Sequence, residues 1–195
     1  MQISAEFVTS ASGANDFPKE PLPEVAMVGR SNVGKSSLLN ALTRHSLART
    51  SAAAGKTRLA NFYRVKRGTA PALFLVDLPG YGYARGGDAS AREFDLLAEA
   101  YFTRPGRRGV MLLVDARHPG LESDMDAWHW LESQPWPRTV IGTKVDKLTR
   151  AERARHARQF ETLFDIPVPL VSAHTGEGLD ELWKMIANLP KATAA

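Results

Sequence analysis

The sequence of 195 residues contains no cysteine. This absence excludes disulfides, catalytic thiols and zinc–thiolate sites, and it fits a cytoplasmic protein. Long apolar runs are missing as well, because the longest, 72–76 and 110–114, are far too short to cross a bilayer. The first residues form neither a basic segment nor an apolar one, so we expect no secretion signal and no membrane contact.

A strong charge excess is also lacking. There are 25 Lys and Arg against 21 Asp and Glu, a net charge of +4, which permits contact with phosphate-rich partners without identifying one. Hydrophobic residues make up 44% and charged residues 24%, the balance of a single soluble domain, which we expect to be a monomer. Residues 1–23 are polar and end in a proline cluster, so we predict an extended, irregular lead-in. A domain over 24–190 and a tail over 191–195 would follow.

From residue 24 onward, short apolar runs alternate with helical patterns. Five runs rich in β-branched residues have the length and composition of strands buried on both faces of a parallel sheet. These runs are Val25–Val28, Leu73–Val76, Val110–Val114, Thr139–Ile141 and Val168–Val171. The alternating segment Asn61–Lys66 suits an edge strand. Helices are predicted over Lys35–Leu42 and Arg92–Tyr101, and from near Leu121, Thr149 and Leu179, the fourth of them opened by a capping box.

This alternation predicts an α/β fold with a doubly wound, mostly parallel six-stranded sheet and an antiparallel edge strand. In such sheets ligands bind at the carboxyl ends of the strands, so we expect the motifs at those ends to form the binding site.

The first predicted strand is followed by a glycine-rich loop and then a helix. The segment from Gly29 to Ser36 matches the pattern G-x-x-x-x-G-K-S/T in the strand–loop–helix setting that the pattern requires. Backbone N–H groups of such a loop close around a polyphosphate, Lys35 neutralises the β- and γ-phosphates, and Ser36 offers a hydroxyl to Mg²⁺. A plain glycine turn beside a solvated lysine is the alternative. The predicted phosphate-binding residues are Gly29, Arg30, Ser31, Asn32, Val33, Gly34, Lys35, Ser36 and Ser37.

A second motif, Asp-Leu-Pro-Gly, ends the strand Leu73–Val76. An Asp here reaches Mg²⁺ through water, and the N–H of the glycine meets a γ-phosphate. Alone the motif is weak, because acidic residues and glycines form ordinary turns after many strands. Its candidate ligand residues are Asp77, Leu78, Pro79 and Gly80.

Two further motifs point to the base of the nucleotide. In Thr-Lys-Val-Asp, the carboxylate of Asp146 can accept hydrogen bonds from N1–H and N2–H₂ of guanine, a donor pair that adenine lacks. In Ser-Ala-His, backbone N–H groups are available for guanine O6. Each motif alone is also read as an ordinary surface turn, but their order at successive strand ends predicts a guanine nucleotide. The candidate residues are Thr143, Lys144, Val145, Asp146, Ser172, Ala173 and His174.

In this order the motifs resemble those of the translation-factor-class GTPases over roughly residues 24–189. The segments Gly29–Asn40, Gly55–Thr57, Asn61–Tyr63, Asp77–Ala84 and Thr143–Asp146 resemble more closely the EngB (YihA/YsxC) family of small bacterial GTPases. The resemblance implies a P-loop GTPase fold, GTP and GDP as ligands, slow hydrolysis and Mg²⁺ dependence. It also implies action in assembly of the large ribosomal subunit and a link to cell division and septation.

The resemblance also assigns a role to a segment that the residues alone leave open. Thr57 would ligate Mg²⁺ only when a γ-phosphate is present, and the surrounding residues would close over the nucleotide. Without the resemblance, this small-residue stretch also reads as a simple linker. The closing segment is Gly55, Lys56, Thr57, Arg58 and Leu59. The expected metal ligands are then Ser36, Thr57 and Asp77, and the expected catalytic residues are Lys35, Thr57 and Gly80.

Tyr81 stands where small GTPases such as Ras place the glutamine that orients the attacking water. A phenol has no amide with which to align water, so we predict slow intrinsic hydrolysis that needs outside help. The candidates for this help with hydrolysis are ribosomal RNA, a partner residue or a K⁺ ion near Asn32. Tyr81 and Tyr83 read equally well as partner-facing residues and as loop anchors.

Three basic clusters make contact with ribosomal RNA or the large subunit a plausible reading, although each alone resembles an ordinary solvated face. They comprise Lys144, Lys147, Arg150, Arg153, Arg155 and Arg158; Arg104, Arg107 and Arg108; and Lys56, Arg58, Arg64, Lys66 and Arg67. Two other functions stay open at this point. One is an RNA-binding assembly factor in which GTP is structural, and the other is a P-loop ATPase or small-molecule kinase.

Overall fold

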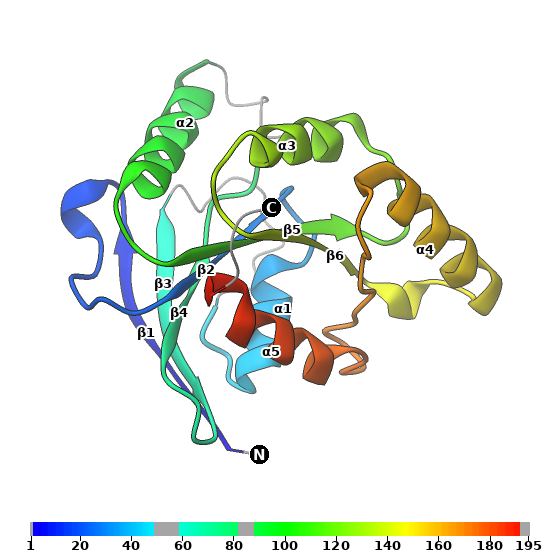
Figure 1. Cartoon of the computed structure of the whole chain (residues 1–195), viewed down its shortest axis with the longest axis horizontal. Coiled ribbons are helices and arrows are strands. Elements are labelled where there is room, and N and C mark those ends of the chain that lie inside the picture. Colours follow the sequence, from blue (N-terminus) through cyan, green and yellow to red (C-terminus); the bar gives the residue numbers. More distant parts are fainter. Residues whose placement is uncertain (1, 49–58, 82–87, 192–195) are drawn as a thin grey trace.

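The structure, a computed structural model, describes residues 2–48, 59–81 and 88–191, without the side chains of 88–95 and 191. Its centre is a six-stranded sheet in the order β1-β3-β4-β2-β5-β6 (Figure 1). Strands β4, β2, β5 and β6 run parallel, while β3 is antiparallel to both of its neighbours, β4 and β1. The strands are β1 Ile3–Ala11, β2 Glu24–Gly29, β3 Ala60–Arg67, β4 Leu73–Asp77, β5 Arg108–Asp115 and β6 Arg138–Thr143.

Helices cover both faces of this sheet (Figure 1). They are α1 Lys35–Thr43, α2 Asp88–Thr103, α3 Glu122–Glu132, α4 Arg150–Phe164 and α5 Leu179–Asn188, with short 3₁₀ turns at Ala14–Asp16, Val145–Lys147 and Leu189–Lys191. The apolar residues of α2, α3 and α4 share one core cluster, and those of α1 and α5 share the other. The predicted doubly wound α/β fold is therefore confirmed.

The central strand β2 shows why the sheet is buried on both sides. Ala26 and Val28 belong to the cluster under α2 and α3, whereas Val25 and Met27 belong to the cluster under α1 and α5. Because successive side chains of a strand point to opposite faces, a strand between two helical layers must be apolar throughout. This is the reason for the continuous apolar runs of the sequence.

The prediction for the N-terminal segment is wrong over residues 3–11, which form strand β1 rather than an irregular lead-in. The strand pairs antiparallel with β3 from Ile3 opposite Arg67 to Ala11 opposite Ala60, with a bulge between Phe7 and Thr9. The proline cluster that argued against a strand begins only at Pro18, beyond the paired residues. As a result β3, which we expected at the edge, lies inside the sheet and β1 forms the edge.

The strand predicted over Val168–Val171 is also absent from the described sheet, apart from a single bridge between Leu170 and Gly142. Gly142 N–H donates to the Pro169 carbonyl at 2.9 Å, and Val171 N–H donates to the Gly142 carbonyl at 2.7 Å. Pro167 and Pro169 have no N–H to donate, so the ladder cannot extend beyond this short contact. The segment nevertheless runs beside β6 and brings Ser172 to the end of the sheet.

Two helix boundaries follow their sequence signals, whereas α2 is longer at both ends than the predicted Arg92–Tyr101. The capping box of α4 is present: the Thr149 hydroxyl accepts from Glu152 N–H at 3.3 Å, and the Glu152 carboxylate accepts from Thr149 N–H at 2.8 Å. Helix α5 ends at Asn188, before a turn that contains Pro190. None of the helices in the described part of the chain combines the length and apolarity that a membrane span requires.

The capping box gives a test of local stability. We expect Thr149→Ala to lower the free energy of unfolding by about 1 kcal/mol, because it removes the acceptor for a backbone N–H at the start of α4. Urea denaturation followed by circular dichroism measures the change. The matched control is Thr162→Ala, since the exposed Thr162 hydroxyl donates only to the Arg158 carbonyl within the same helix. Equal losses in the two variants would contradict a capping role.

Candidate functional site

The loop between β2 and α1 has the backbone that a phosphate cradle requires. Gly34, the N-cap residue of α1, has a φ of 109°, a conformation that side chains with a Cβ rarely adopt. The turn brings the chain directly into α1, so the N–H groups of the first helical turn face the loop. A helix N-terminus with free N–H groups and a favourable dipole attracts anions.

Lys35 lies within this loop rather than in solvent. Its side-chain nitrogen, Nζ, donates to the Gly29 carbonyl at 3.1 Å and to the Arg30 carbonyl at 3.4 Å. Burial lowers the pKa of Lys35, and the nearby Asp77 carboxylate partly opposes this shift. A buried ammonium held by backbone carbonyls is poised for an additional anionic partner.

Ser36 and Asp77, two of the predicted metal ligands, are brought together from α1 and β4. The Ser36 hydroxyl donates to Oδ2 of Asp77 at 3.3 Å. Oδ1 of Asp77 is buried and has no hydrogen-bond partner among the described residues. Burial raises the pKa of Asp77 above its ordinary value, and the charge of Lys35 and the Ser36 hydroxyl oppose this shift only in part. A hydroxyl beside an unsatisfied buried carboxylate oxygen fits a hard divalent cation such as Mg²⁺.

The predicted third metal ligand, Thr57, lies outside the described residues, as do Gly55, Lys56 and Arg58. Leu59, the last residue of the same predicted segment, is exposed just before β3. The described part of the chain thus provides two of the three expected metal ligands.

The segment after β4 rests directly on the phosphate loop. A Cβ on Gly80 would lie 2.7 Å from the Ser31 hydroxyl oxygen and 2.8 Å from the Ser31 nitrogen, so only glycine fits there. Ser31 N–H also donates to the Tyr81 carbonyl at 3.3 Å. The Leu78 side chain is buried in the core, so only the backbone of this residue is available to a nucleotide. A phosphate group bound beside Ser31 would therefore lie close to the backbone of Gly80.

Tyr81 is hydrogen-bonded as a loop anchor, one of the two roles that the sequence left open; Tyr83 lies outside the described residues. The Tyr81 hydroxyl donates to Oδ1 of Asp124 on α3 at 2.8 Å. Burial raises the pKa of Tyr81, and burial also raises the pKa of Asp124. Sequence reasoning missed Asp124. Its signal was an acidic residue three positions after Leu121 and four before Trp128, on the apolar side of the helix.

At the end of β6, Thr143 ties the predicted base site to the phosphate site. Its hydroxyl lies 2.7 Å from the Val33 carbonyl in the phosphate loop and 3.1 Å from the Val114 carbonyl on β5. The hydroxyl is buried, where a hydrogen bond is worth most and its loss costs most. Thr143 thus acts as a brace between two parts of the site.

Lys144 makes a second connection of the same kind. Its Nζ donates to the Asn32 carbonyl at 2.7 Å and to Oδ2 of Asp115 at 3.0 Å. Burial raises the pKa of Asp115, but hydrogen bonds from Arg117 and Lys144 outweigh it and hold the pKa below its ordinary value. The ammonium group of Lys144 is therefore bound to the phosphate loop and to Asp115. The aliphatic part of the Lys144 side chain remains available to pack against a base.

The Asp146 carboxylate is held in place by Ser172. The Ser172 hydroxyl donates to Oδ1 of Asp146 at 2.7 Å, and Lys147 lies 3.3 Å from Oδ2. The Ser172 hydrogen bond lowers the pKa of Asp146, so the group is an acceptor-only carboxylate at neutral pH. This is the charge state that two N–H donors of guanine require.

In the Ser-Ala-His segment, fewer backbone N–H groups are free to bind a ligand than the sequence suggested. Ser172 N–H donates to the Glu177 carbonyl at 3.0 Å, and His174 N–H donates to the Ser172 hydroxyl oxygen at 3.1 Å. Ala173 N–H has no acceptor among the described residues and remains available for guanine O6. The Ser172 hydroxyl thus holds both the Asp146 carboxylate and the loop that we predict to face the base.

Comparison with known proteins agrees with this geometry. A family model described as a 50S ribosome-binding GTPase matches residues 24–144. A probable GTP-binding protein EngB from Pelotomaculum thermopropionicum is 46% identical over 193 residues, which cover 94% of this chain and 93% of that protein. The chain belongs to the EngB family of GTPases.

Solved structures show the same fold. A crystal structure of a probable GTP-binding protein EngB matches with a TM-score of 0.63 at 19% identity, over 86% of this chain and 98% of that chain. Era in complex with MgGDPNP and nucleotides 1506–1542 of 16S ribosomal RNA matches with a TM-score of 0.73 at 24% identity. That match covers 86% of this chain and 56% of the Era chain, so this member of the EngB family spans little more than half of Era.

The position of Asp146 predicts a change in base preference. We expect Asp146→Asn to weaken GTP binding by about tenfold to a hundredfold and to strengthen XTP binding, because the amide replaces one acceptor with a donor. Titration with fluorescent GTP, XTP and ATP analogues measures all three affinities. The control is Asp165→Asn, at the C-terminal end of α4. An unchanged ratio of GTP to XTP affinity, or equal affinity of the wild type for ATP and GTP, would refute the role of Asp146.

Proposed function

We propose that this member of the EngB family is a Mg²⁺-dependent GTPase switch of slow intrinsic turnover. The observation that carries the proposal is the contact of Gly80 and Tyr81 with Ser31 of the phosphate loop. A γ-phosphate bound in the loop would meet Gly80 N–H, so the segment after β4 would respond to its presence or loss. The predicted phosphate and base residues described above would hold the nucleotide.

In this proposal Ser36 and Asp77 would hold Mg²⁺, together with Thr57. The ion would supply charge neutralisation for the phosphates during transfer. The contribution of the chain is to hold Ser36 beside the buried Asp77 carboxylate, one oxygen of which lacks a partner among the described residues.

Slow turnover is supported by the side chain of Tyr81. Its hydroxyl is engaged by Asp124 on α3, away from the phosphate loop, and its ring has no group that orients water as an amide does. We therefore propose that hydrolysis is completed by a group from outside the chain.

We propose the large ribosomal subunit, through its RNA, as the partner that supplies this help. The proposal is supported by the description of the family model, a 50S ribosome-binding GTPase. The complex of the related fold Era with 16S ribosomal RNA supports only the more general idea that this fold can contact ribosomal RNA. The site of action would be the cytoplasm and the active form a monomer. A role in cell division and septation is proposed on the family resemblance alone.

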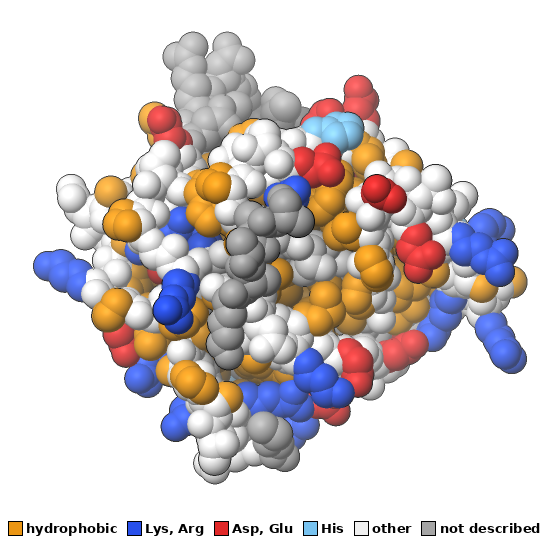
Figure 2. Space-filling model, viewed as in Figure 1, with side chains coloured by type: hydrophobic (Ala, Val, Ile, Leu, Met, Phe, Trp, Pro, Cys, Tyr) orange, Lys and Arg blue, Asp and Glu red, His pale blue; other side chains and the backbone are white. Residues whose placement is uncertain are grey.

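Ion pairs within the fold limit which of the basic residues are available to contact RNA. Arg104 and Arg108 form ion pairs with Glu24, and Arg67 forms one with Asp180, so these basic residues are used within the fold. On α4 the side chains of Arg150, Arg155 and Arg158 are exposed. Figure 2 shows Lys and Arg side chains gathered at the edge of the molecule that α4 forms. We propose this edge as the RNA-binding surface.

An RNA-binding assembly factor with structural GTP is the second candidate, favoured by the same exposed arginines. It differs from the first in one measurable respect, since its GTP is never hydrolysed. A P-loop ATPase or small-molecule kinase is disfavoured because Asp146, ionised and held by Ser172, would have no function with adenine.

Phosphate release from preloaded GTP separates these functions. We expect slow single-turnover hydrolysis by the chain alone, a rise of at least about tenfold with 50S subunits, and loss of turnover when EDTA removes Mg²⁺. Isolated 30S subunits serve as the control and should not accelerate the reaction. Rapid hydrolysis without ribosomes would contradict the slow switch, and GTP that stays intact with 50S subunits would favour the structural reading.

The α4 surface is tested by salt dependence. We expect Arg155→Ala combined with Arg158→Ala to weaken binding to 50S subunits and to reduce the slope of log K against log salt by about 1–2, because two phosphate contacts are lost. Sedimentation at several salt concentrations provides the measurement. Lys184→Ala on α5, which removes an exposed lysine paired with Glu181, is the control. An unchanged slope in the double variant would place the RNA contact elsewhere.

Comparison of K⁺ with Na⁺ tests whether Asn32 serves as a K⁺ ligand. Asn32 has a φ of 63°, and its backbone carbonyl accepts from Lys144. Its side-chain amide is exposed and has no hydrogen-bond partner among the residues that the structure describes, so its oxygen could serve as a K⁺ ligand. We expect 50S-stimulated hydrolysis to be about tenfold faster in K⁺ than in Na⁺, a barrier difference of about 1.4 kcal/mol. Asn32→Gly, which tolerates the same φ, should abolish this difference. Equal wild-type rates in both salts would show that Asn32 only shapes its turn.

A further inference from the structure

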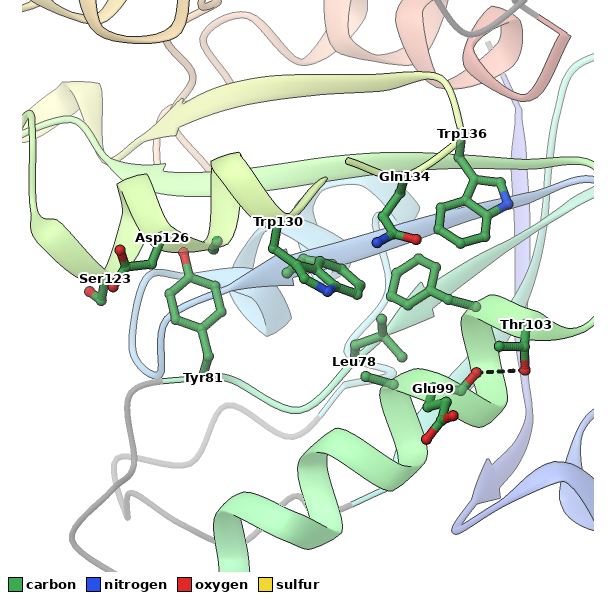
Figure 3. Close-up of a pocket in the computed structure, with 13 residues that line it drawn as sticks. Leu78, Tyr81, Glu99, Thr103, Ser123, Asp126, Trp130, Gln134 and Trp136 are labelled. Atoms are coloured by element: carbon green, nitrogen blue, oxygen red, sulfur yellow. Dashed lines mark hydrogen bonds between the residues drawn. The ribbon is translucent and has the colours of Figure 1, made fainter. Parts of the chain in front are cut away.

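A cavity opens between α2, α3 and the segment after β4, outside the nucleotide site (Figure 3). Its volume is about 680 Å³, within the range of pockets that hold ligands or anchor side chains. The lining residues come from β2, the segment after β4, α2, α3 and the turn after α3: Val28, Leu78, Tyr81, Ala98, Glu99, Phe102, Thr103, Ser123, Asp126, Ala127, Trp130, Gln134 and Trp136.

Aromatic side chains form the apolar part of this cavity. Trp130 on α3 is 43% exposed, although it packs edge-on against Phe102 with ring centroids 5.2 Å apart. Trp136 packs against the same ring at 5.0 Å. Large exposed aromatic side chains beside a pocket are typical of the residues that dominate binding energy at protein interfaces.

Among the residues whose side chains the structure describes, the charged ones that line the cavity are all acidic. Glu99 and Asp126 are the charged side chains that line it, and both are exposed. Helix α3 carries Glu122, Asp124, Asp126 and Glu132 and no Lys or Arg, in a chain whose net charge is +4. Figure 2 shows Asp and Glu side chains gathered over α3. Such a rim attracts cationic groups and repels the phosphates of nucleic acid.

We propose that this cavity is the docking site of a basic protein segment. An aliphatic side chain of the segment packs against Trp130 and Trp136, and its Lys or Arg residues lie over Glu99 and Asp126. Charge complementarity favours a basic peptide over RNA, and the apolar lining requires an anchor that a polar polycation lacks. The proposal depends on the cavity and its charge, and on neither hydrolysis nor ribosome binding.

Docking at this cavity would be sensed at the phosphate loop. The ring of Tyr81 lines the cavity, while its backbone carbonyl accepts from Ser31 N–H. Leu78, which follows Asp77 directly, lines the cavity as well. A segment bound there contacts the same short stretch that rests on the phosphate site.

Chemical shifts of the tryptophan indole N–H groups test the proposal in the ¹⁵N-labelled full-length chain. The probe is the acetylated, amidated peptide Lys-Arg-Leu-Arg-Lys-Leu-Lys-Arg. We expect it to shift the indole signals of Trp130 and Trp136 and to leave that of Trp183 unchanged, because Trp183 is buried under α1, where it donates to the Leu42 carbonyl. A charge-reversed peptide with Glu and Asp, and a peptide with Ser in place of Leu, should bind at least about tenfold more weakly.

Two variants locate the contact. Trp130→Ala should weaken the peptide by about thirtyfold, and Asp126→Lys by about fivefold, while Leu163→Ala at an exposed position of α4 should have no effect. Absence of shifts at both indoles, equal binding of the charge-reversed peptide, or unchanged affinity in Trp130→Ala would each overturn the proposal. A stronger response to a short single-stranded RNA than to the peptide would overturn it as well.

Discussion

The buried hydrogen bond from the Thr143 hydroxyl to the Val33 carbonyl is the interaction on which the site depends. It joins the end of β6 to the loop after β2, two strands that are separated in the sheet by β5. Lys144 adds a second bond from the same strand end to the Asn32 carbonyl. The distance between the carboxylate of Asp146 and the phosphate loop is therefore fixed by short covalent and hydrogen-bonded connections. This spacing is what a single protein site needs in order to hold a base at one end and phosphates at the other.

Much of this arrangement could be predicted from the sequence because its signals are local. The phosphate loop needs glycine at a positive φ next to a helix start, and Gly34 and Lys35 show both requirements within two residues. The buried parallel strands are recognised by continuous apolar runs. Asp77 and Asp146 follow from their places at the end of β4 and after β6, where the topology of the sheet brings separate motifs together. Ser172 reaches the same edge although the strand expected before it is reduced to a single bridge.

The parts that could not be predicted depend on partners far away in the chain. Strand β1 alternates only weakly and becomes a strand because β3 offers an open edge, which no local pattern reveals. Asp124 and Asp115 matter through the groups that face them, Tyr81 and Lys144. The basic cluster at Arg104 and Arg108 looks like a surface patch in the sequence. Its guanidinium groups instead pair with Glu24 and stack over Tyr101, so the count of arginines overstated the charge available to RNA.

Tyr81 bonds in two directions, through its carbonyl to Ser31 and through its phenol to Asp124. Both contacts belong to one residue, so the rigid phenol ring and the backbone of Tyr81 connect Asp124 to Ser31 directly. Helix α3 and the phosphate loop are consequently connected through a single residue, Tyr81. Any force that displaces α3 is transmitted to the edge of the nucleotide site without passing through the central sheet.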